Sequence, residues 1–544
     1  MNRFSISTPE GTRDLLFASS RAIRQMETKI RASLEENGYS EVITPSVEYF
    51  DVFAQANPAL AQENMLKIID RSGRICVARP DNTTPIARIA ATRLDDGALP
   101  VKLCYSQKVF RSVGGDHGHK GEFLQIGAEY IGADGLQADQ DILSAAFAAL
   151  SRTEADTFRI ELGHAEIYKA LIEELGADAE TEEQIHHLIE NKSFAALGDA
   201  LKSFNGRPAA QALCRIPQLF GGIEVLDEVA FLTGNTRVLG AIAYLRRLYQ
   251  ALDNAGYADK IMIDLGLVHE MDYYTGIMFR GYIGGAGAAI LSGGRYNALC
   301  ARFGRDLPAG GFGIDVESVA ENLNRKEQIS NQRNTVRIAL TKGRLEKKTL
   351  ALLKTAGYDV SELETASRKL IFTLPNTKIE LVLAKAADVI TYVEHGVCDM
   401  GVVGKDTIME KGGSFYEMID LGFGKCRFAL ATQKNKDFYG AYKTPVIATK
   451  YPAVTKAFFN KKNMDVETIK IEGSVELAPL LELADAIVDI VETGATLREN
   501  GLEVIEEVAP VSARVIVNLA SAKMKKSAIQ KVIDDLETGM TAEQ

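Results

Sequence analysis

Residues 485–502, DAIVDIVETGATLRENGL, combine an apolar strand, a turn of small residues and the start of a helix. Asp489 lies near the end of the strand, and Glu492 precedes the turn Thr493, Gly494, Ala495 and Thr496. Small residues let backbone N–H groups approach an anion, and a helix N-terminus adds partial positive charge. The two carboxylates can accept hydrogen bonds from ribose hydroxyls. The segment therefore fits a sugar phosphate, although a helix with a threonine cap and a glycine turn explains it at least as simply.

A second strand-to-helix turn carries two cations, Lys342 and Arg344. Cations at a helix start oppose the helix dipole, so a bound anion would explain them. A pair of solvated charges is an equally good explanation of this turn taken alone. Arg368, in ASRKLIF, is a third cation beside an apolar run, and by itself it is more typical of a surface residue.

Strands and helices alternate around these turns from VRIALTK at residue 336 onward. Such alternation predicts mostly parallel sheets, here in two α/β lobes with a cleft over residues 335–544. The segment before it, ENLNRKEQISNQRN, is polar and lacks an apolar period, so residues 322–334 are interpreted as a linker.

Residues 1–321 show a different pattern. An amphipathic helix is predicted over residues 20–38, closed by Gly38, and strands 101–111 and 122–132 are expected to form a hairpin with a long loop. Further strands follow between residues 261 and 296. Neighbouring strands joined by loops, with helices gathered elsewhere, indicate an α+β domain with an antiparallel sheet.

The bulk properties narrow the function. The chain has 544 residues and a net charge of −11, which argues against broad nucleic-acid binding but not against a local anion site. Its six cysteines are too widely spaced for a zinc or redox motif. The N-terminus has no signal-peptide pattern, and no apolar run reaches the length of a membrane span. We therefore expect a cytoplasmic protein that does not bind a membrane.

The second half resembles the short-form ATP phosphoribosyltransferases from about Val336 to Asp535. The matching stretches are TKGRLEKKTLALLKTAGY, ASRKLIF, DVITYVEHGVCDMGVVGKD, ATKYP, IEGSVELAP and ADAIVDIVETGATLRENGL. The resemblance implies two lobes of the periplasmic-binding-protein type. It also implies the first step of histidine biosynthesis, in which ATP and phosphoribosyl pyrophosphate give N1-(5-phosphoribosyl)-ATP and pyrophosphate.

The resemblance also implies roles for individual residues. Arg344 and Arg368, assisted by Lys342, would stabilise the departing pyrophosphate. Thr493, Gly494, Ala495 and Thr496 would hold the 5′-phosphate, and Asp489 with Glu492 would hold the ribose. Asp388 and Tyr392 are candidates for the ATP side, whereas His395 is more typical of a structural residue. Mg²⁺ would be held mainly by substrate phosphates rather than by a protein site.

Residues from about Pro9 to Val319 resemble the catalytic core of histidyl-tRNA synthetase. The matching motifs are PEGTRD at 9, ARPDNT at 78, FR at 110, EFLQIGAE at 122, DYYTG at 272 and SGGRY at 292. Three cationic positions of that family differ, because His269, Gly121 and Ser318 stand where arginines are expected. Adenylation develops negative charge on phosphate, so these losses should abolish most of it.

The residues that form the amino-acid pocket in that family have counterparts here. Asp81, Gln125 and Glu129 would hold the amino group and imidazole of histidine, Arg111 the carboxylate, and Tyr273 and Tyr274 the ring. A pocket that binds without reacting resembles the regulatory subunit that accompanies the short-form transferase, which implies activation and feedback inhibition by L-histidine. The histidine site is expected either in this pocket or at the interface between the halves.

Two other functions would use the same segments. An aminoacyl-tRNA ligase is disfavoured by His269, Gly121 and Ser318, by the acidic charge and by the missing tRNA-reading domain, so no tRNA partner is expected. A pair of solute sensors is disfavoured by the combination of Arg344, Arg368 and the 489–496 segment, which favours catalysis. Relatives assemble from several subunits, so a homo-oligomer is expected.

Overall fold

The computed structural model describes residues 7–56, 65–111, 120–268, 274–328, 335–364, 369–440 and 443–543. The chain forms two compact units. The first consists of Met1–Arg333 together with Leu519–Met524, and the second of Asn334–Asn518 together with Lys525–Gln544. Within the described residues no helix is long and apolar enough to cross a membrane.

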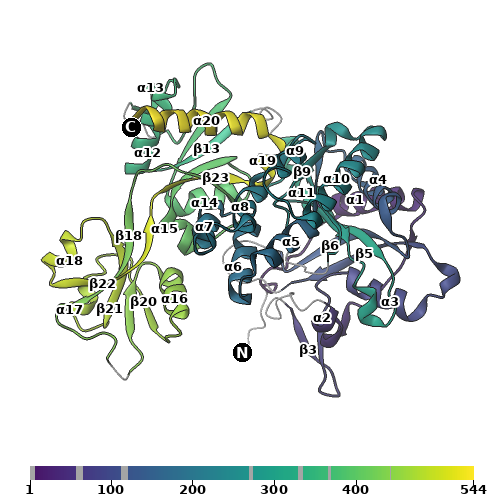
Figure 1. Ribbon diagram of the computed structural model, residues 1–544, viewed down its shortest axis with the longest axis horizontal. Helices are drawn as coiled ribbons and strands as arrows, with labels where there is room; N and C mark the ends of the chain where they lie inside the picture. The colour runs from purple at the N-terminus through teal and green to yellow at the C-terminus, as the bar shows by residue number, and fades with distance from the viewer. Residues whose placement is uncertain are drawn as a thin grey trace. The chain divides into compact units, whose positions relative to one another are not determined.

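The first unit is built on a nine-stranded sheet with the order β1-β5-β6-β12-β11-β10-β7-β9-β8 (Figure 1). Its strands are β1 Ser40–Glu41, β5 Val101–Phe110, β6 Glu122–Ile131, β7 Phe158–His164, β8 Phe220–Gly221, β9 Ile261–Asp264, β10 Ile277–Ile283, β11 Leu291–Arg295 and β12 Ala309–Asp315. All neighbours run antiparallel except β1 with β5 and β7 with β9. The predicted α+β fold and its hairpin, β5 with β6, are confirmed.

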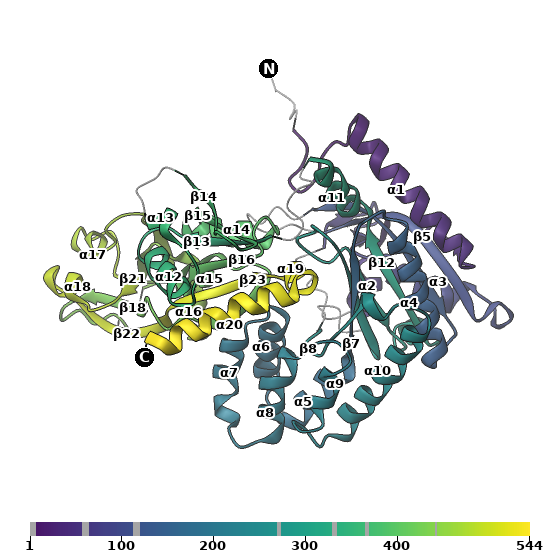
Figure 2. The same cartoon turned by 90° about the horizontal axis from the view of Figure 1, so that it is seen from above.

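Helices bury apolar side chains against this sheet. The predicted N-terminal helix is α1, Phe17–Glu36, whose residues Ile23, Met26, Ile30 and Leu34 are buried at helical spacing. It packs on α4, Gly135–Ser151, and on α11, Val316–Gln328, which lies beside it in Figure 2. The other helices of this unit are α2 Phe50–Ala56, α3 Thr83–Arg93, α5 Ala165–Leu175, α6 Ala179–Glu190, α7 Phe194–Ala200, α8 Pro208–Arg215, α9 Val225–Val229 and α10 Thr236–Asn254.

Helix α11 corrects the linker prediction. The segment interpreted as a linker begins at residue 322, but the helix continues to Gln328. Asn322 is 8% exposed, and Leu323 packs against the apolar core, so the polar sequence still has one face on the protein. A small sheet in the order β2-β4-β3 completes the unit, with β2 Val47–Tyr49, β3 Lys67–Ile69 and β4 Ile75–Ala78.

The second unit has two lobes, each with its own sheet, as predicted. The six-stranded sheet has the order β14-β15-β13-β16-β23-β17, and the five-stranded sheet the order β20-β19-β21-β18-β22. The strands are β13 Val336–Thr341, β14 Ile371–Thr373, β15 Ile379–Ala384, β16 Met400–Gly404, β17 Phe415–Asp420, β18 Cys426–Gln433, β19 Val446–Thr449, β20 Glu467–Lys470, β21 Ala486–Val491, β22 Leu502–Val511 and β23 Ala513–Asn518. The helices are α12 Arg344–Thr355, α13 Ser361–Glu364, α14 Ala386–Glu394, α15 Lys405–Lys411, α16 Pro452–Lys461, α17 Leu477–Leu480, α18 Ala495–Glu499 and α20 Lys526–Glu543.

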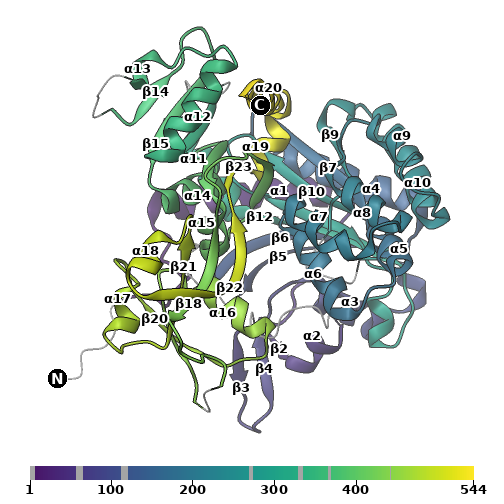
Figure 3. The same cartoon turned by 60° about the vertical axis from the view of Figure 1, so that its left-hand side comes forward.

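These sheets are mixed, so the prediction of mostly parallel sheets is wrong for several strand pairs. Strands β13, β15 and β16 pair in parallel, as do β19, β20 and β21, but β23 pairs antiparallel with β16 and β17, and β18 pairs antiparallel with β21 and β22. Parallel neighbours need a crossover connection. The long strands change sheet directly instead: only Ser512 separates β22 from β23. In Figures 1 and 3 these strands join the two lobes of the second unit.

Candidate functional site

The turn between β13 and α12 presents two cations at the edge of the six-stranded sheet. The Thr341 hydroxyl donates to the carbonyl oxygen of Val402 at 2.8 Å, which ties the end of β13 to β16. Gly343 has a φ of 101°, which favours glycine, and caps α12. Lys342 and Arg344, on either side of it, are exposed. The predicted turn thus exists, and its cations face solvent.

Arg344 is paired with Glu492 across the two lobes. Its Nη1 lies 2.9 Å from Oε2 and 3.1 Å from Oε1 of Glu492, which follows β21 in the other sheet. The two side chains are 57% and 58% exposed. Exposed ion pairs contribute at most about 1 kcal/mol, so this pair opens easily. The tertiary structure therefore brings together two segments that the sequence separates by 148 residues.

The small-residue turn between β21 and α18 is formed as predicted. Gly494 has a φ of 72°, and a Cβ added there would lie 3.2 Å from Nη1 of Arg498. The Thr493 hydroxyl accepts a hydrogen bond from the N–H of Ala495 at 3.4 Å, while Thr493 and Thr496 are both exposed. The hydroxyl of Thr493 thus also supports the turn, as expected for a threonine cap with a structural role.

Asp489 lies at the base of that turn. It is partly buried, and burial raises its pKa, with a further increase from the nearby charge of Glu476. Its Oδ1 accepts a hydrogen bond from the N–H of Ile490 at 2.8 Å. The carboxyl is therefore held in place beside the turn rather than projecting into solvent as Glu492 does.

The remaining predicted residues of this unit are less informative. Asp388 is exposed in the first turn of α14, whereas Tyr392 packs against the apolar cluster beneath that helix. The Nδ1 of His395 lies 3.0 Å from the carbonyl oxygen of Thr391, consistent with a structural role. Arg368 lies outside the described residues.

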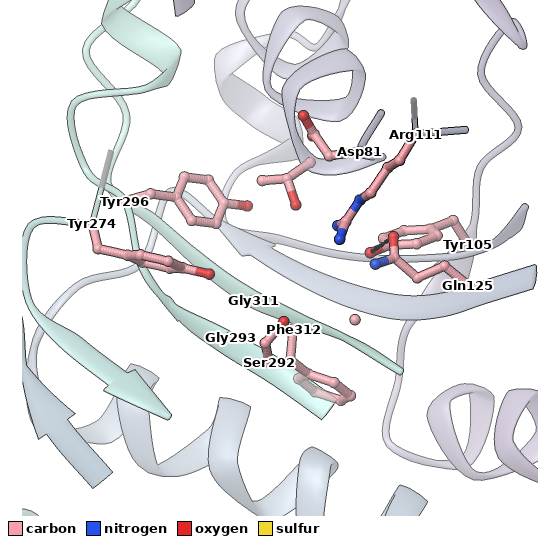
Figure 4. A pocket seen from close by; sticks show the side chains of 12 residues that line it. Asp81, Tyr105, Arg111, Gln125, Tyr274, Ser292, Gly293, Tyr296, Gly311 and Phe312 are labelled. Carbon is pink, nitrogen blue, oxygen red and sulfur yellow. Dashed lines mark hydrogen bonds between the residues drawn. The ribbon is translucent and has the colours of Figure 1, made fainter. Parts of the chain in front are cut away.

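In the first unit, side chains from the sheet and from the start of α3 surround a pocket (Figure 4). Four predicted histidine-site residues line it: Asp81, Arg111, Gln125 and Tyr274. Three further lining residues, Thr83, Tyr105 and Tyr296, have no role that the sequence motifs predict. Thr83 and Tyr296 lie in stretches that matched the synthetase motifs, which was the available signal. Tyr273, like His269, lies outside the described residues.

Glycines make room for this pocket. A Cβ on Gly313 would lie 2.7 Å from Nε2 of Gln125, and one on Gly127 would lie 2.4 Å from the hydroxyl of Tyr105. Contacts this short force a shift of the polar groups. Glycines of β6 and β12 therefore leave room for the polar side chains of Gln125 and Tyr105, which line the pocket together with Gly293 and Gly311 (Figure 4).

Hydrogen bonds hold the polar side chains of the pocket. Oε1 of Gln125 accepts from Nδ2 of Asn82 at 2.9 Å and from the Tyr105 hydroxyl at 3.2 Å. Asp81 is 5% exposed, and its carboxylate accepts from the N–H and the hydroxyl of Thr84 at 2.8 and 3.1 Å. Burial raises the pKa of Asp81, while these bonds and the charge of Arg111 oppose that increase.

Glu129 lies beneath the pocket rather than on its surface. It is 1% exposed and accepts hydrogen bonds from the Tyr296 hydroxyl at 2.5 Å and the Thr83 hydroxyl at 2.7 Å. Burial raises the pKa of Glu129 to about 8, despite these two bonds. The carboxyl group is therefore protonated at neutral pH, and it contacts two lining side chains from below.

This shift predicts a pH effect on stability. The ordinary pKa of a glutamate side chain is 4.5, so between about pH 4.5 and 8 the folded protein binds a proton that the unfolded chain does not. The contribution of Glu129 to stability is therefore fully present below pH 4.5 and falls as the pH rises toward 8. We expect Glu129→Gln to flatten the fall in Tm between pH 5 and 8. Glu183→Gln, at an exposed position of α6, should have the same dependence of Tm on pH as the wild type. An equal effect of both variants would contradict the assignment of the pH effect to Glu129.

Carboxylates neutralise two cations, Arg13 and Lys120, at the start of helix α11. Arg13 is paired with Glu317, at 3.0 Å, and with Glu321. Nζ of Lys120 donates to the hydroxyl of Ser318 at 3.1 Å and lies 3.4 Å from Oε2 of Glu321. Arg13 and Lys120 are therefore already paired with acidic groups. Gly121 and Ser318 supply no cation at the two positions where the synthetase family has arginine.

Comparisons with known proteins find relatives of both halves of the chain. Residues 11–319 match the family described as histidyl-tRNA synthetase, and residues 385–538 match ATP phosphoribosyltransferase. An ATP phosphoribosyltransferase regulatory subunit of Clostridium kluyveri is 39% identical over 60% of this chain and 84% of its own length. An ATP phosphoribosyltransferase of the same organism is 56% identical over 37% of this chain and 92% of its own length. The crystal structure of an ATP phosphoribosyltransferase regulatory subunit/histidyl-tRNA synthetase from Bacillus halodurans covers 71% of this chain and 94% of its own, with a TM-score of 0.56 and 26% identity.

Proposed function

This chain belongs to the histidyl-tRNA synthetase family through residues 11–319 and to the ATP phosphoribosyltransferases through its C-terminal half, and we propose that its second unit joins ATP to phosphoribosyl pyrophosphate while its first unit regulates that reaction. The observation that carries the proposal is the pair of Arg344 with Glu492. It brings a cationic helix start from one lobe to the mouth of a small-residue turn in the other lobe.

The proposed reaction needs positioning and charge stabilisation, not a protein nucleophile. Adenine N1 of ATP forms a bond to the anomeric carbon of the sugar, and the bond from that carbon to the pyrophosphate oxygen breaks. The pyrophosphate leaves with the electron pair. Preorganised cations lower the barrier most where such charge develops. We assign this role to Arg344, assisted by Lys342 and Arg368.

The small-residue turn would hold the other end of the sugar. Thr493, Gly494, Ala495 and Thr496 would bind the 5′-phosphate through backbone N–H groups and hydroxyls. Asp489, fixed at the base of the turn, and Glu492 would accept hydrogen bonds from the ribose hydroxyls. Substrate binding would then release Arg344 from Glu492, so the carboxylate becomes available to ribose as the guanidinium becomes available to pyrophosphate. On the ATP side, we propose a contact by Asp388, whereas Tyr392 would support its helix by packing.

We further propose that the required divalent cation is Mg²⁺. Mg²⁺ prefers oxygen ligands and usually binds through substrate phosphates with one or two carboxylates. The carboxylates of Asp489 and Glu492 supply that donor type beside the turn, so the residues present fit the ion. When bound, the metal would neutralise part of the phosphate charge.

For the first unit we propose L-histidine as the ligand and feedback inhibition as the role. Asp81, Gln125 and Glu129, through Thr83 and Tyr296, would hold the amino group and imidazole. Arg111 would meet the carboxylate, and Tyr274 with Tyr273 would enclose the ring. We also propose that the chain forms a homo-oligomer, as the resemblance to multi-subunit relatives implies.

A transferase assay tests this proposal. Purified full-length protein is mixed with ATP, phosphoribosyl pyrophosphate and Mg²⁺, and phosphoribosyl-ATP is followed with and without L-histidine. We expect product that requires both substrates and is suppressed by histidine. Product that is indifferent to histidine would overturn the regulatory role alone, and no product under any condition would overturn the enzymatic role.

A substitution in the pocket tests the histidine site. We expect Arg111→Ala to weaken L-histidine binding about 10- to 100-fold, because a hydrogen bond between charged groups contributes about 1.5–3 kcal/mol. Isothermal titration calorimetry measures the Kd. Lys108→Ala removes a 53% exposed cation from β5, where it pairs with Glu122, and should leave the Kd unchanged. Equal affinities of the wild type and Arg111→Ala would place the histidine site elsewhere.

A further inference from the structure

Leu519–Met524, helix α19, is part of the first unit although the sequence on both sides of it belongs to the second. Strand β23 ends at Asn518, directly before α19, and α20 begins at Lys526, separated from the end of α19 by one residue. Within the first unit α19 packs on β10 and β7. The first unit is therefore completed by six residues that come from the C-terminal half of the chain.

The helix carries a lysine into the interior of that unit. Lys523 is 1% exposed, and buried lysines are rare unless paired. Its Nζ lies 2.5 Å from Oδ2 of Asp264 and 3.0 Å from Oε2 of Glu161, both of which are buried. It also lies 4.4 Å from the ring centre of Phe220, and its carbonyl oxygen accepts a hydrogen bond from Arg159 at 3.0 Å. Side chain and backbone of Lys523 are thus both held by the first unit.

Lys523 belongs to a buried charge cluster on β7 and β9. Lys192 lies 3.6 Å from Oδ2 of Asp264, and the Tyr282 hydroxyl donates to Oε1 of Glu161 at 2.8 Å. Burial alone would raise the pKa of Asp264, but the ammonium groups of Lys192 and Lys523 outweigh it and lower that pKa. Breaking one partner of such a buried set leaves uncompensated charge, so the cluster depends strongly on Lys523.

The cluster connects with the pocket through packed side chains. Tyr274, which lines the pocket, shares a buried apolar cluster with Leu267 and with Met278 of β10. The N–H of Leu267 donates to the carbonyl oxygen of Asp264 at 3.4 Å. A continuous path therefore runs from Tyr274 through Leu267 and Asp264 to Lys523, and from there along the chain into β23 and α20.

We propose that Lys523 couples the pocket of the first unit to the transferase. A ligand that repositions Tyr274 shifts the Asp264 turn, and Lys523 transfers that shift to the segment between β23 and α20. The proposal rests on the proposed function for the identity of the ligand and of the reaction. Its physical requirement is that pocket occupancy and the docking of α19 change one another's free energy.

Lys523→Met tests the coupling, because methionine keeps the length of the side chain and removes its charge. L-Histidine inhibition is measured by the transferase assay, and L-histidine binding by calorimetry. We expect at least a tenfold rise in the histidine concentration that halves activity, with basal activity within twofold of the wild type and histidine still bound. Lys525→Met is the matched control, since Lys525 pairs within the second unit with Asp399 at 2.9 Å. It should leave inhibition unchanged.

Two further measurements keep the proposal open to refutation. If Lys523→Met does not fold, the double variant Lys523→Met/Glu161→Gln removes the ammonium and the carboxylate of this ion pair together. It should fold and should not be inhibited by L-histidine. Amide hydrogen exchange of residues 513–543 with and without L-histidine needs no activity, so it separates this proposal from the failure of the proposed function. We expect a histidine-dependent change in the wild type that is absent in Lys523→Met. Normal inhibition in a folded Lys523 variant, or no histidine-dependent change in the wild type, would overturn the coupling.

Discussion

Arg344→Ala is expected to lower kcat about 10²- to 10³-fold, the largest single loss in the transferase. The guanidinium stands at the start of α12 and reaches the mouth of the opposite lobe, where its partner Glu492 is only a weak exposed substitute for an anionic ligand. Removing a preorganised donor to a developing charge typically costs this much. The kcat of Arg344→Lys should lie between those of the wild type and Arg344→Ala, because lysine keeps the charge but loses the planar fork of donors.

The separate effects on kcat and KM distinguish catalysis from simple binding. If Arg344 acts on the departing pyrophosphate, kcat falls more than the KM for phosphoribosyl pyrophosphate rises. Lys354→Ala, at an exposed position in the last turn of the same helix, is the control and should retain normal kinetics. An Arg344→Ala variant with near-normal kcat would show that the pair with Glu492 is structural only.

Gly494→Val should raise the KM for phosphoribosyl pyrophosphate at least tenfold. The backbone of Gly494 is left-handed, and an L-residue with a Cβ costs about 1–2 kcal/mol there. A Cβ would also lie 3.2 Å from Nη1 of the exposed Arg498, so that side chain must move slightly, and the strained backbone displaces the N–H groups that we propose for the 5′-phosphate. Steady-state kinetics at saturating ATP measure the change.

Gly501→Val provides the matched control for this strain. Gly501 lies beyond the other end of α18 with a similar φ of 68°, and an added Cβ would meet no atom within 4 Å. Both variants should lose similar stability in a thermal melt, but only Gly494→Val should lose affinity for the sugar phosphate. A similar KM in the two variants would mean that the effect comes from backbone strain and that the turn does not bind substrate.

Local patterns predicted several elements of the fold. The periods of apolar residues located α1 and the β5–β6 hairpin, and the small-residue turn at Gly494 was correctly placed between a strand and a helix. They failed where strand direction depends on connections between lobes, as for β22 and β23. They also failed at α11, where a polar segment stays helical because Leu323 packs on the core.

The candidate site residues follow the same division. The motifs identified Asp81, Arg111, Gln125 and Tyr274 without any geometry, and the pocket indeed gathers them. The sequence could not place Glu129 below the pocket, because burial and the resulting pKa depend on the whole sheet. Nor could it show that Tyr105 faces the pocket, since that depends on the glycines of neighbouring strands.

The sequence by itself determined the two fold classes, the strand-to-helix turns with their charges, and the loss of arginines at Gly121 and Ser318. These are local properties of residue type and spacing. Only the tertiary structure decided that Arg344 meets Glu492 and that Lys523 completes a charge cluster in the first unit. Partners that lie 148 and 259 residues apart carry no local signal, because their contact depends on how sheets and helices pack.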